Sequence, residues 1–235
     1  MCGITGFINL NGAPASSVIL KKMTDKIAHR GPDGEGQWGE GNVGIGHRRL
    51  AILDLSPAGH QPMSTEDNRF VISYNGEVYN FSELRTELEA LGHRFYSRTD
   101  TEVVLKSFAQ WGRDSLGKFN GMFAFAVWDR VGKQLFFARD RYGIKPLYYW
   151  RGPGALVFGS EIKAIMAYPG FRGGVDIQAL PEYLTFQNFF TDRTLFEGVR
   201  ILPAGSWMTV DAHGVANGPQ ITSTCIMSLD HLDMS

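Results

Sequence analysis

The second residue of the chain, Cys2, is the residue best suited to covalent chemistry. Removal of Met1 would leave Cys2 with both a thiol and a free α-amine. The unperturbed pKa of an α-amine is about 7.7 to 8.0 and that of a thiol about 8.5, so the amine can take the thiol proton near neutral pH. One residue would then supply the nucleophile and its general base. The alternative is a cysteine that only fills the buried start of a first strand.

Asn75 and Gly76 directly follow an apolar run that predicts a strand ending at Tyr74. An asparagine amide and a glycine N–H that point to one place can stabilise the oxyanion of a tetrahedral intermediate, and one such donor contributes roughly 3 kcal/mol. Asn-Gly is also the commonest hairpin signal, so a plain turn is the alternative. The sequence leaves both interpretations open.

Charged residues that could hold an amino acid occur at three further positions. Arg49 ends a glycine-punctuated segment, and a guanidinium binds a carboxylate with two hydrogen bonds. Glu77 and Asp100 could each bind an ammonium group. The alternatives are a surface arginine at Arg49 and a helix N-cap at Asp100. Together the three would hold the carboxylate and α-amine of an amino acid while Cys2 acts on its side-chain amide.

The elements that must position these residues are mainly strands. Strands are predicted at residues 4–10, 44–55, 69–74, 121–128, 134–139, 147–150, 155–158 and 201–210, and helices at residues 18–29, 81–91, 100–111 and 175–190. Asn80 or Ser82 is the expected cap of the second helix. Runs of strands interrupted by grouped helices predict an α+β layered fold rather than a doubly wound one.

Composition excludes several classes of protein. The 235 residues carry 23 Lys plus Arg against 24 Asp plus Glu, a net charge of -1, so no basic surface for nucleic acid is indicated. We expect no membrane span, because the ~18 consecutive apolar residues that one needs are missing, and we expect a cytoplasmic protein. Cys2 and Cys225 are expected to be reduced, and no metal site is expected, because the histidines and cysteines lack ligand spacing.

Ordered motifs run from residue 1 to residue 149, within a longer stretch of similarity that reaches about residue 210. They are Met1-Cys2-Gly3-Ile4, His29-Arg30-Gly31-Pro32-Asp33, Arg49-Leu50-Ala51-Ile52-Leu53-Asp54, Gln61-Pro62-Met63, Tyr74-Asn75-Gly76-Glu77-Val78-Tyr79-Asn80, Asp100-Thr101-Glu102, Gly121-Met122-Phe123-Ala124-Phe125-Ala126, Ala138-Arg139-Asp140-Arg141 and Lys145-Pro146-Leu147-Tyr148-Tyr149. In these motifs the chain resembles the glutaminase domain of glutamine-dependent asparagine synthetases, within the class II (N-terminal nucleophile, Ntn) amidotransferases.

The resemblance implies a four-layer αββα fold, with two antiparallel sheets packed face to face between helical layers. It also implies that Cys2 attacks the carboxamide of L-glutamine, forms a glutamyl thioester and releases ammonia, after which water hydrolyses the thioester. The roles it implies for single residues are the substrate carboxylate for Arg49, the substrate α-amine for Glu77 and Asp100, the oxyanion for Asn75 and Gly76, and further substrate contacts for the backbone around Ile52 and Leu53. The charges of residues 29–33 and 139–141 are expected to tie loops to the sheet.

The chain departs from the family in its length. Asparagine synthetases continue into an ATP-pyrophosphatase domain, which this chain lacks, so we expect a glutaminase domain at residues 1–210 and a tail or truncated linker at residues 211–235. The glutaminase step needs no cofactor, whereas ATP and magnesium belong to the missing synthetase activity.

The expected partners are L-glutamine and a synthetase domain or subunit that accepts the ammonia for amidation of aspartate or a related carboxylate such as a sugar acid. A homodimer is also expected, because the family often forms dimers. The alternative function is a non-catalytic or partner-dependent module that binds glutamine and regulates another protein.

Overall fold

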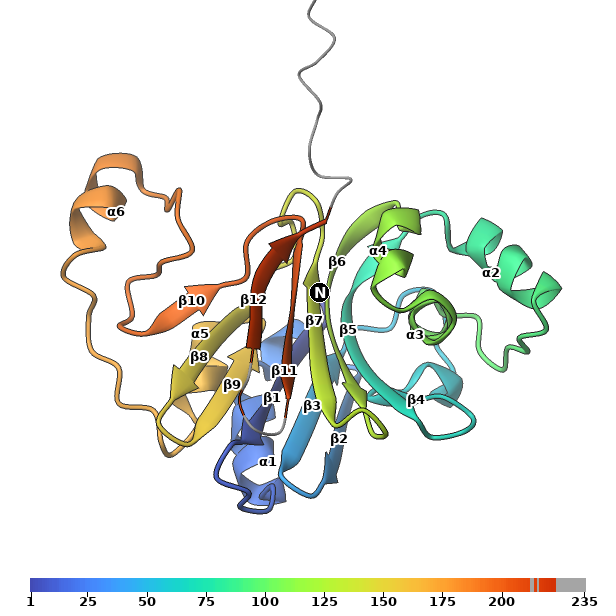
Figure 1. The fold of residues 1–235 in the computed structure, drawn as a ribbon, viewed down its shortest axis with the longest axis horizontal. Coiled ribbons are helices and arrows are strands. Elements are labelled where there is room, and N and C mark those ends of the chain that lie inside the picture. The colour runs from blue at the N-terminus through green and yellow to red at the C-terminus, as the bar shows by residue number, and fades with distance from the viewer. Residues whose placement is uncertain (212–213, 215, 223–235) are drawn as a thin grey trace, which may run out of the picture.

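Two six-stranded antiparallel sheets form the centre of the molecule (Figure 1). The computed structural model describes residues 1–211, 214 and 216–222. The first sheet has the order β10 (Val199–Ile201), β8 (Tyr148–Gly152), β9 (Ala155–Gly159), β1 (Gly3–Asn9), β3 (Val43–Arg49) and β2 (Gly34–Glu40). The second has the order β12 (Ala216–Ile221), β11 (Ser206–Asp211), β7 (Gln134–Arg139), β6 (Gly121–Asp129), β5 (Phe70–Val78) and β4 (Met63–Ser64).

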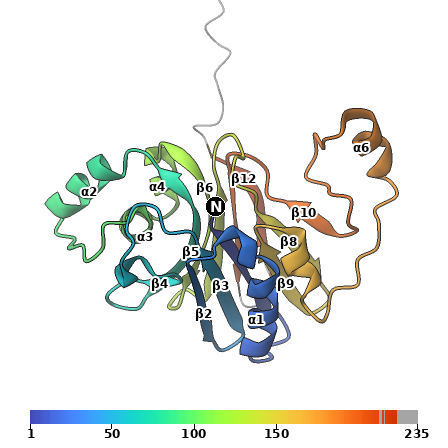
Figure 2. The ribbon, with the colours of Figure 1, turned by 180° about the vertical axis from the view of Figure 1, so that it is seen from behind.

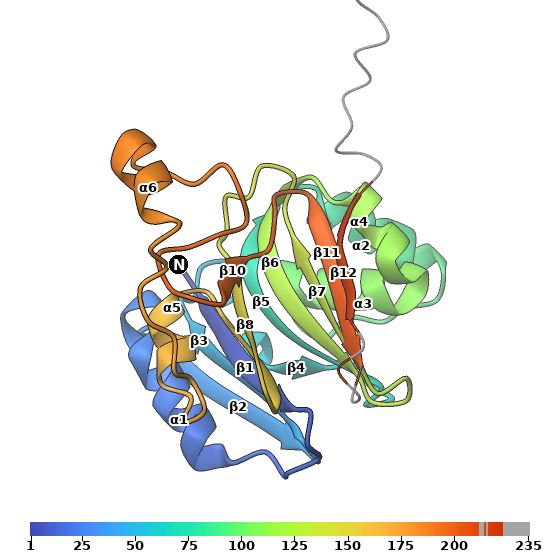
Figure 3. The same cartoon turned by 60° about the vertical axis from the view of Figure 1, so that its left-hand side comes forward.

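Helices cover the outer face of each sheet. α1 (Ser17–Lys26) and α5 (Ile162–Met166) lie on the first sheet, as the view from behind shows (Figure 2). α2 (Phe81–Ala90), α3 (Asp100–Trp111) and α4 (Ser115–Lys118) lie on the second, whereas α6 (Leu180–Phe186) lies apart from both sheets (Figure 3). The short 3-10 turns are η1 (Ala28–Arg30), η2 (Pro57–Gly59) and η3 (Gly112–Asp114). The predicted αββα layering is therefore confirmed.

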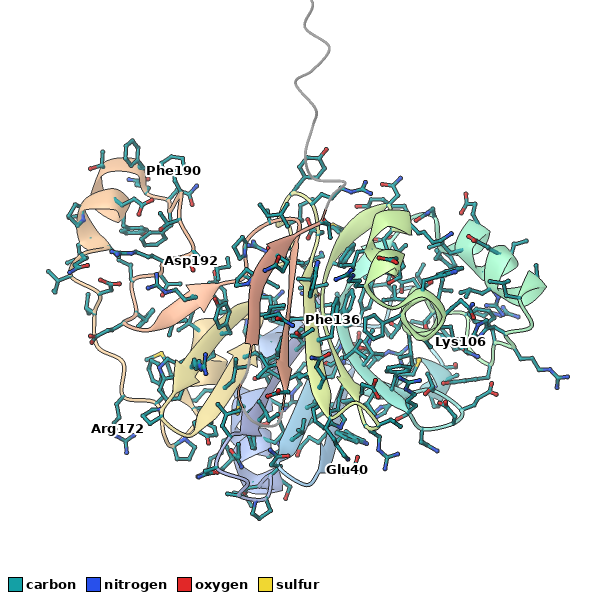
Figure 4. The ribbon with its side chains drawn as sticks, viewed as in Figure 1. Glu40, Lys106, Phe136, Arg172, Phe190 and Asp192 are labelled. Carbon is teal, nitrogen blue, oxygen red and sulfur yellow. The ribbon has the colours of Figure 1, made fainter. Side chains whose placement is uncertain are left out.

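Strand alternation divides the apolar residues among the layers. Along β6, Phe123, Phe125 and Val127 join the core beneath the helices, while Ala124, Ala126 and Trp128 join the core between the sheets. Phe136 on β7 and Lys106 on α3 lie on the helical side of the second sheet, and Phe190 lies in the protruding segment around α6 (Figure 4). A strand that is buried on both faces must be apolar at every position, which explains the continuous apolar runs in the sequence.

Several predicted boundaries are wrong. The strand expected at residues 44–55 ends at Arg49, and the apolar residues beyond it form a loop in which Ile52 is 68% and Leu55 79% exposed. The helix expected at residues 175–190 covers only Leu180–Phe186, because the chain turns at Gln187 with φ 51°. β2 was not predicted, since its sequence, GEGQWGE, is polar and glycine-rich, as suits a strand at a sheet edge.

The C-terminal part also differs from expectation. β12, at Ala216–Ile221, pairs with β11, so part of the expected tail belongs to the second sheet. The remaining tail and Cys225 lie outside the described residues. No helix among the described residues is long and apolar enough to cross a membrane.

The core between the sheets makes a stability prediction. Phe137 is fully buried, and its ring centroid lies 4.9 Å from that of Phe158 in the other sheet. Phe137→Ala should lower the free energy of unfolding by about 3–5 kcal/mol, because it leaves a cavity in a layer that both sheets enclose. Urea denaturation measures the loss, with Val131→Ala as a control at a position that is 72% exposed. A loss below about 1 kcal/mol for Phe137→Ala would contradict the packing described.

Candidate active site

A cavity of about 210 Å³ opens where β1, β3, β5 and the start of α3 meet. Its walls include every residue that the sequence marked for chemistry or binding: Cys2, Arg49, Ile52, Leu53, Asn75, Gly76, Glu77 and Asp100. They come from separate parts of the chain, so the fold alone brings them together. Met1 and Cys2 precede β1 of the first sheet and line the cavity, and Figure 3 marks the N-terminus at the start of β1.

Cys2 is held by three hydrogen bonds at two of its atoms. Its Sγ accepts a hydrogen bond from Leu50 N at 3.3 Å and donates one to Leu50 O at 3.5 Å. Its carbonyl oxygen accepts a hydrogen bond from Arg30 Nε at 2.8 Å. Burial raises the pKa of the Cys2 thiol, which the Leu50 N–H and the positive charge of Arg49 partly offset. A thiol with a raised pKa needs a nearby base to act as a nucleophile.

Asn75 and Gly76 lie within β5, paired with Ala124 and Phe123 on β6, so the plain-turn interpretation is wrong. Alternation along β5 directs Asn75 toward the first sheet, on the same side as Ser73 and opposite to Tyr74. The Asn75 side chain is 1% exposed, and its Nδ2 has no hydrogen-bond partner in the described part of the chain. A buried amide without a partner costs free energy unless a ligand completes it.

Gly76 is required by close packing. A Cβ at this position would lie 2.6 Å from Met122 O and 2.7 Å from Phe123 Cβ. Any other residue would push β5 away from β6 and displace the Asn75 amide next to it.

Asp100 is a buried carboxylate at the first turn of α3. The N-cap of this helix is Thr99, whose hydroxyl accepts a hydrogen bond from Glu102 N, so the N-cap interpretation of Asp100 is wrong. Instead, Asp100 Oδ2 accepts hydrogen bonds from Tyr74 Oη at 2.7 Å and from Val78 N at 3.1 Å. Burial raises the pKa of the Asp100 carboxyl, more than these hydrogen bonds lower it.

Arg49 bends the loop that follows β3 into a wall of the cavity. Its Nη1 donates to Ser56 O at 2.9 Å, and its Nη2 donates to Asp54 O. The Asp54 carboxylate in turn accepts hydrogen bonds from Ser56 N at 2.8 Å and Arg98 N at 3.0 Å, and the Ser56 hydroxyl together with these bonds lowers its pKa to about 2. The loop therefore presents Ile52 and Leu53 to the cavity. The surface-arginine interpretation of Arg49 is wrong, because this side chain is partly buried and organises the site.

Sequence reasoning missed several residues that build the site. Tyr74 and Lys145 line the cavity. Both belong to the motifs named above, but the sequence assigned neither of them a role in the site. Arg30, assigned to loop anchoring, holds the carbonyl of the nucleophile itself and pairs with Glu161 at 3.0 Å. Among the described residues, no group of three His, Cys, Asp or Glu side chains could hold a metal ion.

The comparison with protein families gives one clear match. The family model of the glutamine amidotransferase domain matches residues 1–220. The chain belongs to this family. It spans about a third of the length of the curated relatives it matches.

Two curated relatives and one solved structure match most of this chain. The chain is 41% identical over 219 residues to asparagine synthetase [glutamine-hydrolyzing] 3 of Bacillus subtilis, covering 92% of this chain and 36% of that protein. It is 37% identical over 221 residues to amidase chry2 of Gibberella zeae, covering 88% of this chain and 32% of that protein. Glutamine phosphoribosylpyrophosphate amidotransferase of B. subtilis shares the fold, with a TM-score of 0.69 at 20% identity over 92% of this chain and 49% of that chain.

The Asp100 environment predicts a pH-dependent stability. Because the folded pKa of Asp100 lies above its unfolded value, its contribution is greatest at acid pH and is lost as pH rises through the folded pKa. Asp100→Asn keeps an acceptor oxygen but does not titrate. Its stability relative to wild type should therefore increase as pH rises from 4 to 7, because only the wild type loses the Asp100 contribution. Urea denaturation at both pH values measures the change.

The control has the opposite sign. The Thr65 hydroxyl lowers the pKa of the Asp67 carboxyl below its usual 3.8, so most of its titration lies below pH 4, and Asp67→Asn should lose only a little stability relative to wild type between pH 4 and pH 7. An Asp100→Asn variant that followed the Asp67→Asn trend would contradict the buried environment of Asp100.

Proposed function

We propose that this glutamine amidotransferase domain hydrolyses L-glutamine through a Cys2 thioester and releases ammonia for a synthetase partner. The observation that carries the proposal is the buried Asn75 amide: its Nδ2 has no hydrogen-bond partner among the described residues, and Asn75 lines the same cavity as Cys2. An unsatisfied donor beside a nucleophile is what an oxyanion hole requires before its substrate arrives. Burial raises the pKa of the Cys2 thiol, so the thiol needs a base, and the α-amine of the same residue can serve as that base once Met1 is removed.

The reaction begins when the α-amine of Cys2 takes the thiol proton and Sγ attacks the carboxamide carbon of glutamine. The carbonyl oxygen becomes an oxyanion, which the Asn75 amide and the Gly76 N–H stabilise. Collapse of the tetrahedral intermediate breaks the C–N bond, and the α-ammonium returns a proton to the leaving ammonia. Water then adds to the thioester with the same base and releases glutamate.

The other walls of the cavity suit the amino-acid end of glutamine. Arg49 is the cation for the substrate carboxylate, and Glu77 and Asp100 are the carboxylates for its α-ammonium. The loop backbone around Ile52 and Leu53 supplies the remaining contacts. The cavity of about 210 Å³ has room for one small amino acid.

The acceptor of the ammonia is proposed to be aspartate or a related carboxylate, bound by a synthetase domain or subunit. The named relatives, an asparagine synthetase and an amidase, join similar domains to long further segments, which supports a partner outside this domain. We propose that the glutaminase step needs no cofactor, and that ATP and magnesium serve the partner's reaction. We also propose that the protein forms a homodimer and is located in the cytoplasm.

The first test is glutamate release from L-glutamine by the purified chain, with intact mass confirming the loss of Met1. We expect turnover by wild type and none above background by Cys2→Ala, because Cys2 supplies both the nucleophile and the base. Cys225→Ser is the control, since it removes the other cysteine and should keep wild-type turnover. An electrophilic glutamine analogue should label Cys2.

Other outcomes would overturn this proposal. Labelling at a different residue, or equal turnover by Cys2→Ala, would refute the thioester mechanism. Glutamine binding by calorimetry without turnover, in a chain that has lost Met1, would favour the regulatory module instead.

Asn75 gives a second test of the mechanism. Asn75→Ala should lower kcat about 100- to 1,000-fold with little change in KM, because the amide stabilises charge that develops only in the transition state. Steady-state kinetics measures both constants, with Asn11→Ala at an exposed turn as the control. An equal loss for both variants, or a loss confined to KM, would remove Asn75 from the oxyanion hole.

A further inference from the structure

Lys145 places a buried cation at the active-site cavity. Its side chain is only 6% exposed, and its Nζ donates to the Sδ of Met1 at 3.3 Å. None of the ion pairs found among the described residues involves Lys145, so its ammonium has no carboxylate partner there. A buried ammonium without an anion is costly, and lysine ordinarily extends its charge into water. Removal of Met1 would take away even the sulfur.

The loop that carries Lys145 is fixed rigidly. The buried carboxylate of Asp140 accepts hydrogen bonds from the backbone N–H groups of Lys145 at 3.0 Å, Ile144 at 3.0 Å, Tyr142 at 3.1 Å and Phe123 at 3.1 Å. The guanidinium of Arg139 donates to the carbonyl of Lys145 at 2.9 Å, and also to the carbonyls of Gly143 and Leu202. Both backbone groups of Lys145 are therefore anchored, so its position is built into the fold.

The two reactive groups of Cys2 face different neighbours. The thiol is bound to Leu50, on the β3 side. The nitrogen that becomes the α-amine is bonded to Met1, the residue whose sulfur contacts Lys145. Lys145, Met1 and Cys2 line one cavity, so the ammonium of Lys145 and that nitrogen lie at the same site.

The remaining charges around the α-amine create a conflict. Glu77 from β5 and Asp100 from α3 line the cavity, and both favour a protonated amine. Tyr74 is neutral there, because burial raises its pKa well above the usual value. Arg49 from β3 opposes the carboxylates but faces the loop at residues 54–56. Arg30 from η1 is bound to Glu161, which also pairs with His29 and Lys163.

The carboxylates proposed to bind the substrate's ammonium would therefore also raise the pKa of the α-amine. A protonated α-amine cannot accept the thiol proton, so it cannot act as the base. We propose that the ammonium of Lys145 counters these carboxylates and keeps the α-amine of Cys2 unprotonated near neutral pH, which makes Lys145 a positioning residue for the general base. The inference rests on the proposed function, since it concerns the base of that reaction. A like charge in the same cavity favours the neutral form of an amine and so lowers its pKa.

The test is an NMR titration of Cys2 that needs no turnover. Cysteine labelled with ¹³C is incorporated in a Cys225→Ser background, so that Cys2 gives the single signal, and intact mass confirms the loss of Met1. We expect Lys145→Met to raise the α-amine pKa by about one unit and Lys145→Arg to restore it. Lys22→Met, which removes an exposed charge on α1, should leave it unchanged. The acid limb of the kcat/KM profile should move by the same amount.

Each outcome decides the matter. An α-amine pKa in Lys145→Met within a few tenths of a unit of wild type would overturn the role of Lys145, even if glutamine is hydrolysed. If wild type releases no glutamate, the proposed function fails, but the titration still decides whether Lys145 sets the amine pKa. Lys145→Gln, which keeps polarity, replaces Lys145→Met if the latter does not fold, and the same shift is expected of it.

Discussion

The structure depends on holding a reactive residue at the end of the chain, where a polypeptide is ordinarily least ordered. Cys2 precedes β1, which lies between β9 and β3 in the middle of the first sheet. Arg30 Nε binds the Cys2 carbonyl at 2.8 Å, and Ser160 Oγ accepts a hydrogen bond from Ile4 N at 3.0 Å. These contacts come from η1 and from the segment after β9, so the first sheet and its helices must be complete before the thiol is fixed.

The second requirement is that the two sheets keep one relative position, because the thiol belongs to the first and the Asn75 amide to the second. Two polar contacts cross the otherwise apolar layer close to the site. His47 Nε2 on β3 donates to Tyr74 O on β5 at 3.0 Å, and Ser73 Oγ donates to Gly46 O at 3.2 Å. Burial lowers the pKa of His47 to about 3, so the first contact does not change with protonation near neutral pH. Such bonds fix the register between sheets that apolar packing alone would leave freer.

The sequence predicted an α+β layered fold, most strands and the eight residues that meet at the cavity, but it missed the roles of Tyr74, Lys145 and Arg30 and the local geometry. Apolar runs identify strands that are buried on both faces, as in β6, yet the same run at residues 51–55 is a loop that lines the cavity. Asn75-Gly76 has the composition of a turn, and only pairing with β6 places it within a strand. Local propensity is overruled in both cases by contacts with distant residues, which a single sequence does not encode in any short window.

Two buried polar groups of the site carry a cost that the sequence alone did not reveal. Asn75 Nδ2 has no hydrogen-bond partner among the described residues, and burial raises the pKa of the Asp100 carboxyl. Each costs stability in the free protein, and a ligand with an oxygen beside Asn75 and an ammonium beside Asp100 would recover both costs. Because such a ligand binds the folded state alone, its affinity adds to the stability of the fold. The arrangement therefore trades stability without ligand for selectivity: an amino acid that lacks the side-chain amide leaves the Asn75 donor buried and unpaired.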